Sequence, residues 1–304
     1  MLIYILQRLL QGAVVLLGVS IVVFFLVNLT GDPAAMLLPL NTPEEDVKLF
    51  RHQMGFDRPL PVQYALFMSR AVQGDFGFSY RHRTPAMPLV LARLPATLKL
   101  TAIAFVFALV FAVPAGILAA LRQNTLLDAV TRTLTLLGQA MPGFWLAIML
   151  ILIFAVRLRW FPVSGTGSWK SLVLPGITVG SFIMATITRL LRSSLLEVLG
   201  ENYIRTAHAK GLGYSKVLLR HAIQNAAIPI VTVIGLQITF LIGGSIIAEA
   251  VFAYPGIGLL AFQAIATRDI PVIQAYVAIV ATITILMNLM VDITYTWLDP
   301  RVRL

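Results

Sequence analysis

The side chains able to perform chemistry are few in this sequence, and their spacing matches none of the common catalytic motifs. There is no cysteine, which excludes disulfides, thiolate nucleophiles and thiolate metal sites. The segment 165–171 has the composition of a phosphate-binding glycine loop, but it lacks two glycines five positions apart followed by lysine. Lipase-type Gly-x-Ser-x-Gly and zinc-binding His-Glu-x-x-His motifs are missing as well. We therefore predict no catalytic residue in this chain.

Two acidic residues stand inside or at the end of long apolar runs, where an ionisable side chain is costly and suggests a function. Glu249 lies one turn before a Tyr-Pro-Gly sequence that contains Pro255 and Gly256, so it is a candidate for a gating contact or for a structural one. Asp292 lies seven residues before Asp299. For Asp292 we favour a helix-packing contact with a basic or amide side chain.

The composition indicates that the bilayer is the main solvent of this chain. Of the 304 residues, 59% are hydrophobic and 12% are charged, and that charged share is about half of that in an ordinary soluble domain. Several apolar runs reach about 20 residues, enough to cross the hydrocarbon layer as a helix. The net charge of +10 is explained largely by membrane topology, so we expect membrane lipid around the chain and no nucleic-acid partner.

The apolar runs predict an all-α membrane protein with six transmembrane helices. The predicted spans are 9–29, 95–120, 133–156, 173–194, 228–252 and 271–296. In the ends and short loops, eleven Lys and Arg residues lie on the side of both termini and four lie on the other side. The excess of basic residues places both termini in the cytoplasm. Bends are expected within the spans at Pro114, Pro142, Gly143, Pro175 and Gly176.

We divide the chain into an N-terminal transmembrane helix (1–30), an outward-facing helical insertion (31–94) and a core of five transmembrane helices (95–304). In the insertion, Thr42-Pro43-Glu44-Glu45 predicts a capped helix that ends at Gly55, and a second helix follows from Val62 to Val72. Gly74 to Gly77 then breaks the second helix. The insertion could cover the pathway or touch a delivery protein; the alternative is a packing cap.

The predicted topology places two groups of polar residues relative to the membrane and so suggests their roles. Arg189 and Arg192, at the cytoplasmic end of the fourth span, are expected to anchor that end through their long side chains. The four histidines are split between the two sides, so we predict no metal site. They are His52, His82, His208 and His221.

The segment of about 195–227 is polar enough to leave the membrane on the cytoplasmic side. A helix is expected around Tyr203 to Lys210, Gly211 and Gly213 allow a sharp turn, and helical spacing resumes from Tyr214 to Ile223. Two short helices that meet at a glycine corner can present a compact basic and apolar surface to a protein partner. The alternative is a solvated connecting loop.

Motifs along nearly the whole chain resemble one family, the inner-membrane permeases of dipeptide, oligopeptide and nickel ABC importers, and specifically the first of the two paired permeases. Ala207-His208-Ala209-Lys210-Gly211-Leu212 is similar to the cytoplasmic loop of that family. The wider superfamily has Glu-Ala-Ala and Leu-Pro where this chain has Arg205-Thr206-Ala207 and Ile223-Gln224. The other matching segments are Gly31-Asp32-Pro33, 55–60, 74–79, 249–258, 268–274, 288–292 and 298–301.

The resemblance implies an ATP-driven importer in the bacterial inner membrane. Its expected partners are a second homologous permease, two ATPase subunits that bind ATP and Mg²⁺, and an extracytoplasmic binding protein; this chain would hold no cofactor. A peptide is the expected cargo, but nickel chelates, glutathione, opines and oligosaccharides travel through similar permeases. The alternatives are a stand-alone secondary transporter or channel and, third, a membrane enzyme. The residues expected to contact the ATPase are Arg205, Thr206, Ala207, His208, Ala209, Lys210, Gly211, Leu212, Gly213 and Tyr214.

Overall fold

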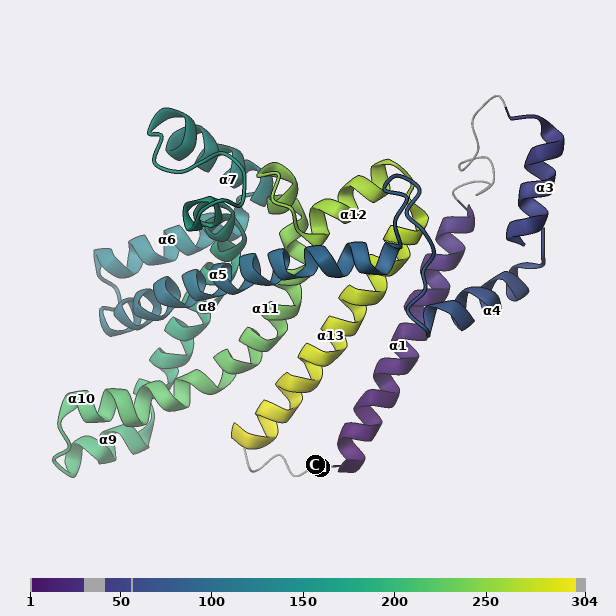
Figure 1. Ribbon diagram of the computed structural model, residues 1–304. Coiled ribbons are helices and arrows are strands. Elements are labelled where there is room, and N and C mark those ends of the chain that lie inside the picture. The colour runs from purple at the N-terminus through teal and green to yellow at the C-terminus, as the bar shows by residue number, and fades with distance from the viewer. Residues whose placement is uncertain (1, 30–41, 56, 299–304) are drawn as a thin grey trace. The chain divides into compact units, whose positions relative to one another are not determined.

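Helices joined by turns and short loops make up the part of the chain described by its computed structural model, which comprises residues 2–29, 42–55 and 57–298 (Figure 1). No strand occurs in these ranges, and the only β-type pairing among them is an isolated bridge between Phe78 and Pro85. The elements are α1 (Leu2–Leu29), α3 (Glu44–Met54), α4 (Leu60–Ala71), α5 (Ala86–Leu121), α6 (Leu126–Ala140), α7 (Gly143–Leu150), η1 (Ile151–Arg157), η2 (Trp169–Leu172), α8 (Val173–Leu199), α9 (Asn202–Ala209), α10 (Tyr214–Val217), η3 (Leu218–Ala222), α11 (Ile223–Val251), α12 (Ile257–Ala266) and α13 (Ile270–Leu298).

The helices confirm the predicted class of an all-α membrane fold. Four of them are long and apolar enough to cross a bilayer, and two bent pairs raise the number of candidate spans to six. The second span begins earlier than predicted, at Ala86, and α5 continues through Pro114. Pro175 falls in the first turn of α8, where a missing N–H group costs no helical hydrogen bond.

The predicted third span, 133–156, is not one straight helix. Its first part is α6, which ends at Ala140, and the helix pair on either side of Met141 and Pro142 is bent by 107°. Proline removes the N–H group that would continue the helix and forces the preceding residue out of the helical region. Met141 accordingly has ψ of 127°. The bend expected at Pro142 is therefore confirmed, and the third span consists of two helices joined at that bend.

The chain divides into two compact units, and each is described by itself. Unit 1 comprises residues 1–95 and 256–286, and unit 2 comprises residues 96–255 and 287–304. Of the three boundaries between the units, those at 95/96 and 286/287 fall inside the long helices α5 and α13, and the one at 255/256 falls between α11 and α12.

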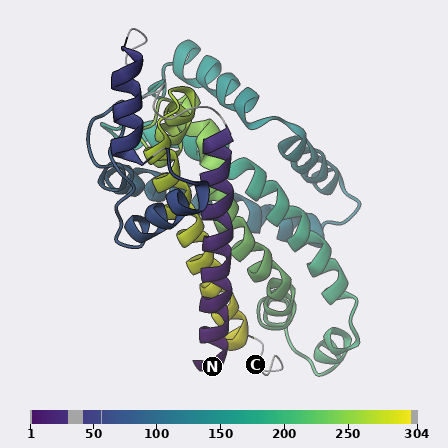
Figure 2. The same ribbon diagram turned by 90° about the vertical axis from the view of Figure 1, so that its right-hand side faces the viewer.

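Unit 1 is built on the close contact of α1 with α13, which lie side by side in both views (Figures 1 and 2). A Cβ atom on Gly12 would lie 2.6 Å from Ile285 Cγ2, so any larger residue would force the Ile285 side chain to shift. The insertion helix α4 joins α1 through Tyr64, whose hydroxyl lies 2.7 Å from Ser20 Oγ. The helix α3 begins at Glu44, one residue after the predicted first position, and ends as predicted at Gly55, which has φ of 73°.

Unit 2 is built on α8, which packs against α5, α6, α7 and α11. A stripe of small residues on α5, Ala104, Ala108 and Ala112, meets larger side chains of α8. The backbones come closest at Gly180, where a Cβ atom would lie 2.5 Å from the carbonyl oxygen of Ala104. Small residues of this kind let membrane helices approach closely, because lipid provides no hydrophobic force between them.

Substitution of Gly180 by alanine should loosen the contact between α5 and α8. The added methyl would collide with backbone, which cannot rotate away, so we expect a lower unfolding midpoint in detergent, by on the order of 5 °C. Gly18→Ala in α1 is the matched control, because a Cβ atom there meets nothing within 4 Å. Equal midpoints for the two variants would contradict the packing described here.

Candidate functional site

The predicted cytoplasmic element is present as two short helices joined at a glycine corner. The helix α9 ends at Ala209, and the N–H groups of Lys210, Gly211 and Leu212 donate to the carbonyls of Thr206, His208 and Ala207. Gly211 has φ of 79°, a conformation that residues with a Cβ atom adopt at a cost. Gly213 has φ of −63° and precedes α10, so the turn itself requires glycine only at position 211.

One face of this element is packed against the rest of unit 2. Ile204 and Ala207 from α9 and Val217 from α10 are buried in a cluster that includes Leu195 of α8 and Ala226 of α11. The hydroxyl of Ser194 donates to the carbonyl of Ala226 over 3.1 Å. The two short helices are thus fixed to the ends of two long ones, which predicts that they move together.

The other face is exposed and basic. The His208 and Tyr214 rings stack on it, with centroids 6.3 Å apart and an interplanar angle of 22°. Of the residues predicted to contact the ATPase, Ala207 is buried and Leu212 is half-buried, and the others are exposed. The exposed ones are Arg205, Thr206, His208, Ala209, Lys210, Gly211, Gly213 and Tyr214.

Glu249 is fully buried near the end of α11 and joins that helix to α5. Its Oε1 accepts hydrogen bonds from Thr97 Oγ1 of α5 at 2.7 Å and from Ser245 Oγ at 3.0 Å. Burial and then the nearby Glu249 carboxyl raise the pKa of Tyr254, which follows α11. Pro255 is half-buried and Gly256 is buried immediately before α12. The carboxyl therefore holds two helices of unit 2 together where the chain leaves α11.

The pair of acidic residues near the C-terminus is described only in part. Asp292 is half-buried on α13, so its predicted packing contact stays a prediction. Asp299 lies outside the described residues.

An ion pair that the sequence analysis missed joins α6 to α8. Arg192 Nε and Nη2 donate to the two carboxylate oxygens of Asp128 at 2.6 and 2.8 Å, and Asp128 is fully buried. The backbone N–H of Asn124 donates to the same carboxylate. The structure thus gives Arg192 an ion pair that was not predicted, while Arg189 is exposed. The anchoring role of both arginines stays a prediction. An acidic residue in the first turn of an apolar helix was the signal available in the sequence.

A second missed contact lies in unit 1, around Asp269 at the start of α13. Its buried carboxylate accepts hydrogen bonds from Ser79 Oγ at 2.5 Å and from the N–H groups of Tyr80 and Arg81 at 3.1 and 3.3 Å. Burial, followed by the charge of Asp269, raises the pKa of Tyr80 to about 12, so this phenol is neutral at physiological pH. Asp269 thus fixes a turn near the end of the insertion to the start of α13.

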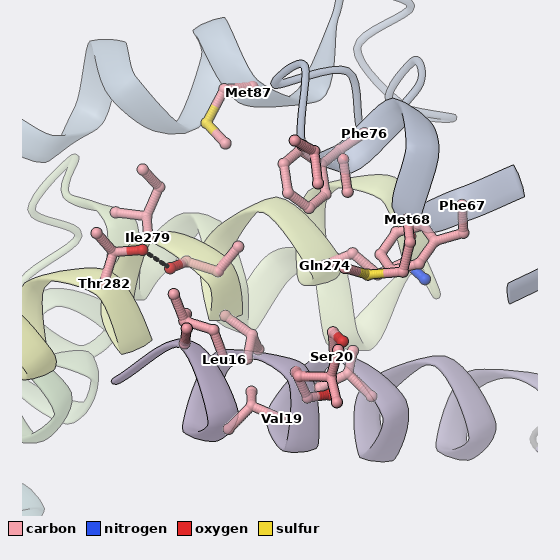
Figure 3. Close-up of a pocket in the computed structure, with 17 residues that line it drawn as sticks. Leu16, Val19, Ser20, Phe67, Met68, Phe76, Met87, Gln274, Ile279 and Thr282 are labelled. Atoms are coloured by element: carbon pink, nitrogen blue, oxygen red, sulfur yellow. Dashed lines mark hydrogen bonds between the residues drawn. The ribbon is translucent and has the colours of Figure 1, made fainter. Parts of the chain in front are cut away.

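A cavity of about 370 Å³ lies in unit 1 between α1, α4 and α13 (Figure 3). Its lining is almost entirely apolar, with Leu16, Phe67 and Met68 among the side chains drawn in Figure 3. Thr282 is one of the few polar lining residues, and its hydroxyl donates to the carbonyl of Ala278 in its own helix. The cavity therefore lacks a set of charged groups that could bind the ends of a peptide.

Comparison with known proteins places the chain in a family. The family model described as the inner membrane component of binding-protein-dependent transport systems matches residues 112–304, and the model of its N-terminal part matches residues 1–101. The chain belongs to this family. It is a membrane-spanning permease subunit of an ABC importer, which confirms the resemblance found in the sequence.

Relatives match over the full length. The chain is 41% identical to the dipeptide transport system permease protein DppB of Alkalihalophilus pseudofirmus, with all of both chains covered. It is also 41% identical to the glutathione transport system permease protein GsiC of Escherichia coli strain K12, covering 100% of this chain and 99% of that one.

Solved structures share the fold at lower identity. An inward-facing structure of the MetNI methionine ABC transporter matches with a TM-score of 0.57 and 20% identity, over 70% of this chain and 97% of that one. An amino acid ABC transporter with histidines matches with a TM-score of 0.53 and 15% identity, over 71% and 94%.

Replacement of Arg192 by methionine should destabilise the protein, because it removes the bidentate partner of the buried Asp128 carboxylate and leaves only the longer, exposed contact with Arg132. We expect the unfolding midpoint to fall by on the order of 5 °C, and the further change Asp128→Asn to restore part of the loss. Arg132→Met is the control, since Arg132 is exposed and lies 3.7 Å from the same carboxylate. Additive effects of the two changes in a double-mutant cycle would contradict a direct ion pair.

Proposed function

We propose that this chain and a second homologous permease form the pathway for a di- or oligopeptide or a peptide-like solute such as glutathione. The observation that carries the proposal is full-length identity of 41% to permeases named for dipeptide and for glutathione transport. Nickel chelates, opines and oligosaccharides are the less supported cargoes. A stand-alone transporter or channel is disfavoured by membership in a family of binding-protein-dependent systems.

The energy would come from partners, namely two ATPase subunits that bind ATP and Mg²⁺, while this chain carries out no covalent chemistry. We propose the segment of about 195–227 as the contact with one ATPase, with Arg205 to Tyr214 at its centre. The exposed basic face and the fixed corner at Gly211 support this assignment. An extracytoplasmic binding protein would deliver the cargo on the opposite side, where the insertion of residues 31–94 would lie.

The packing of this segment suggests how movement of the ATPases reaches the pathway. Because α9 and α10 are packed on Leu195 and Ala226, a push on them would displace α8 and α11 as well. At the far end of α11, Glu249 connects to Thr97 of α5. We propose that this contact changes when the cavity switches between inward and outward access, so Glu249 would be both structural and part of the gate.

Gly211→Val tests the coupling assignment. A β-branched residue is strained at φ of 79°, so the corner should change shape, and uptake per ATP hydrolysed should fall by on the order of tenfold in proteoliposomes. Gly213→Ala is the matched control, because position 213 has ordinary φ and open space. Unchanged uptake and unchanged stimulated hydrolysis in the Gly211 variant would contradict the assignment.

The predicted sidedness can be tested directly, because the chain has no cysteine. In intact cells, a membrane-impermeant thiol reagent should label His82→Cys without cell lysis and should label Lys210→Cys only after lysis. The two positions are both exposed, so accessibility within the protein does not bias the comparison. The reverse labelling pattern would overturn both the topology and the coupling assignment.

A further inference from the structure

The turn of residues 79–84, which precedes α5 within the insertion, is held in one conformation by a dense set of hydrogen bonds. The N–H of Ser79 donates to the carbonyl of Thr84, and the N–H of Arg83 donates to the carbonyl of Ser79. Ser79 Oγ accepts from the N–H of His82 at 2.9 Å while it donates to the buried carboxylate of Asp269. Two chain segments about 190 residues apart in the sequence are therefore held together as one ordered backbone unit.

This backbone unit carries four basic residues, which we name the arginine platform: Arg81, His82, Arg83 and Arg268. All four are exposed, and within the described ranges none of them forms a side-chain ion pair. Arg83 has φ of 54° and Arg268 has φ of 52°. Such values are uncommon for residues other than glycine and persist only where the surroundings enforce them.

The charge of the platform is only partly offset by its own surroundings. Asp269, the carboxylate at its centre, is buried and already accepts three hydrogen bonds. Asp75 is exposed, and its Oδ1 accepts the N–H of Gly77 within its own turn. With three arginines around one buried carboxylate, the platform thus presents a net excess of positive charge on an ordered backbone.

We propose that the arginine platform is a docking surface for an acidic patch on the extracytoplasmic binding protein. The inference rests on the proposed function, which brings that protein to this side of the membrane. Unpaired charges at the rim of an interface mainly accelerate association and set its salt dependence. An ordered backbone favours a protein partner over lipid headgroups, because a fluid anionic surface is attracted by charge without requiring fixed positions.

The test uses the complete importer in proteoliposomes and measures ATP hydrolysis while its cargo-loaded binding protein is titrated. In the double variant Arg81→Glu with Arg83→Glu, the half-saturating concentration of binding protein should rise on the order of tenfold at low salt. The difference should shrink at high salt, and maximal and basal hydrolysis should stay unchanged. The control is Arg58→Glu with Arg70→Glu, which makes the same change in charge at other exposed positions of unit 1.

The other outcomes are distinguishable. An unchanged half-saturating concentration in the platform variant, or an equal increase in the control, would overturn the inference and leave the proposed function intact. A defect seen in vesicles containing phosphatidylglycerol but not in vesicles of phosphatidylcholine alone would assign the platform to anionic lipid instead. If the wild-type complex showed no stimulation by the binding protein, the proposed function itself would fail.

Discussion

A carboxylate removed from water must be given hydrogen-bond donors or a cation, and three such groups determine which segments of this chain are joined. Asp128 pairs with an arginine and joins α6 to α8. Glu249 accepts hydrogen bonds from two hydroxyls and joins α5 to α11. Asp269 accepts hydrogen bonds from a hydroxyl and two backbone N–H groups. The three sites differ in the kind of group that binds the carboxylate. At the Asp128 site the main partner is an arginine, so loss of Arg192 would remove most of the countercharge of a buried carboxylate.

The sequence was sufficient for features that depend on neighbouring residues. Long apolar runs located the spans, and the glycines at 55 and 211 located two left-handed turns, because each signal acts within a few positions of itself. The bend at Pro142 was also predicted, but its size was not, since 107° depends on how the two halves pack.

Contacts between distant residues could not be predicted in the same way. The Asp128–Arg192 and Ser79–Asp269 pairs join residues 64 and 190 positions apart, and each residue alone has an ordinary local explanation. Arg192 has the position of an anchoring residue at the end of a span, and its partner became evident only when α6 was placed against α8. In the candidate site, the glycine corner was predictable, whereas the buried face formed by Ile204, Ala207 and Val217 required the packing of α8 and α11.

The length of α5 has a consequence for the contact at Glu249. With 36 residues the helix measures about 54 Å, well beyond a hydrocarbon layer of about 30 Å. Arg93 and Lys99 lie in its first half, so Thr97 is placed near the level of the headgroups rather than at the centre of the bilayer. If α5 and α11 separated there, water could reach the carboxyl at once and replace the lost hydroxyl. Rehydration would then lower the free energy needed to separate α5 from α11 at this point. The same hydrogen bond at the centre of the membrane would have no water to replace it, and its loss would cost more.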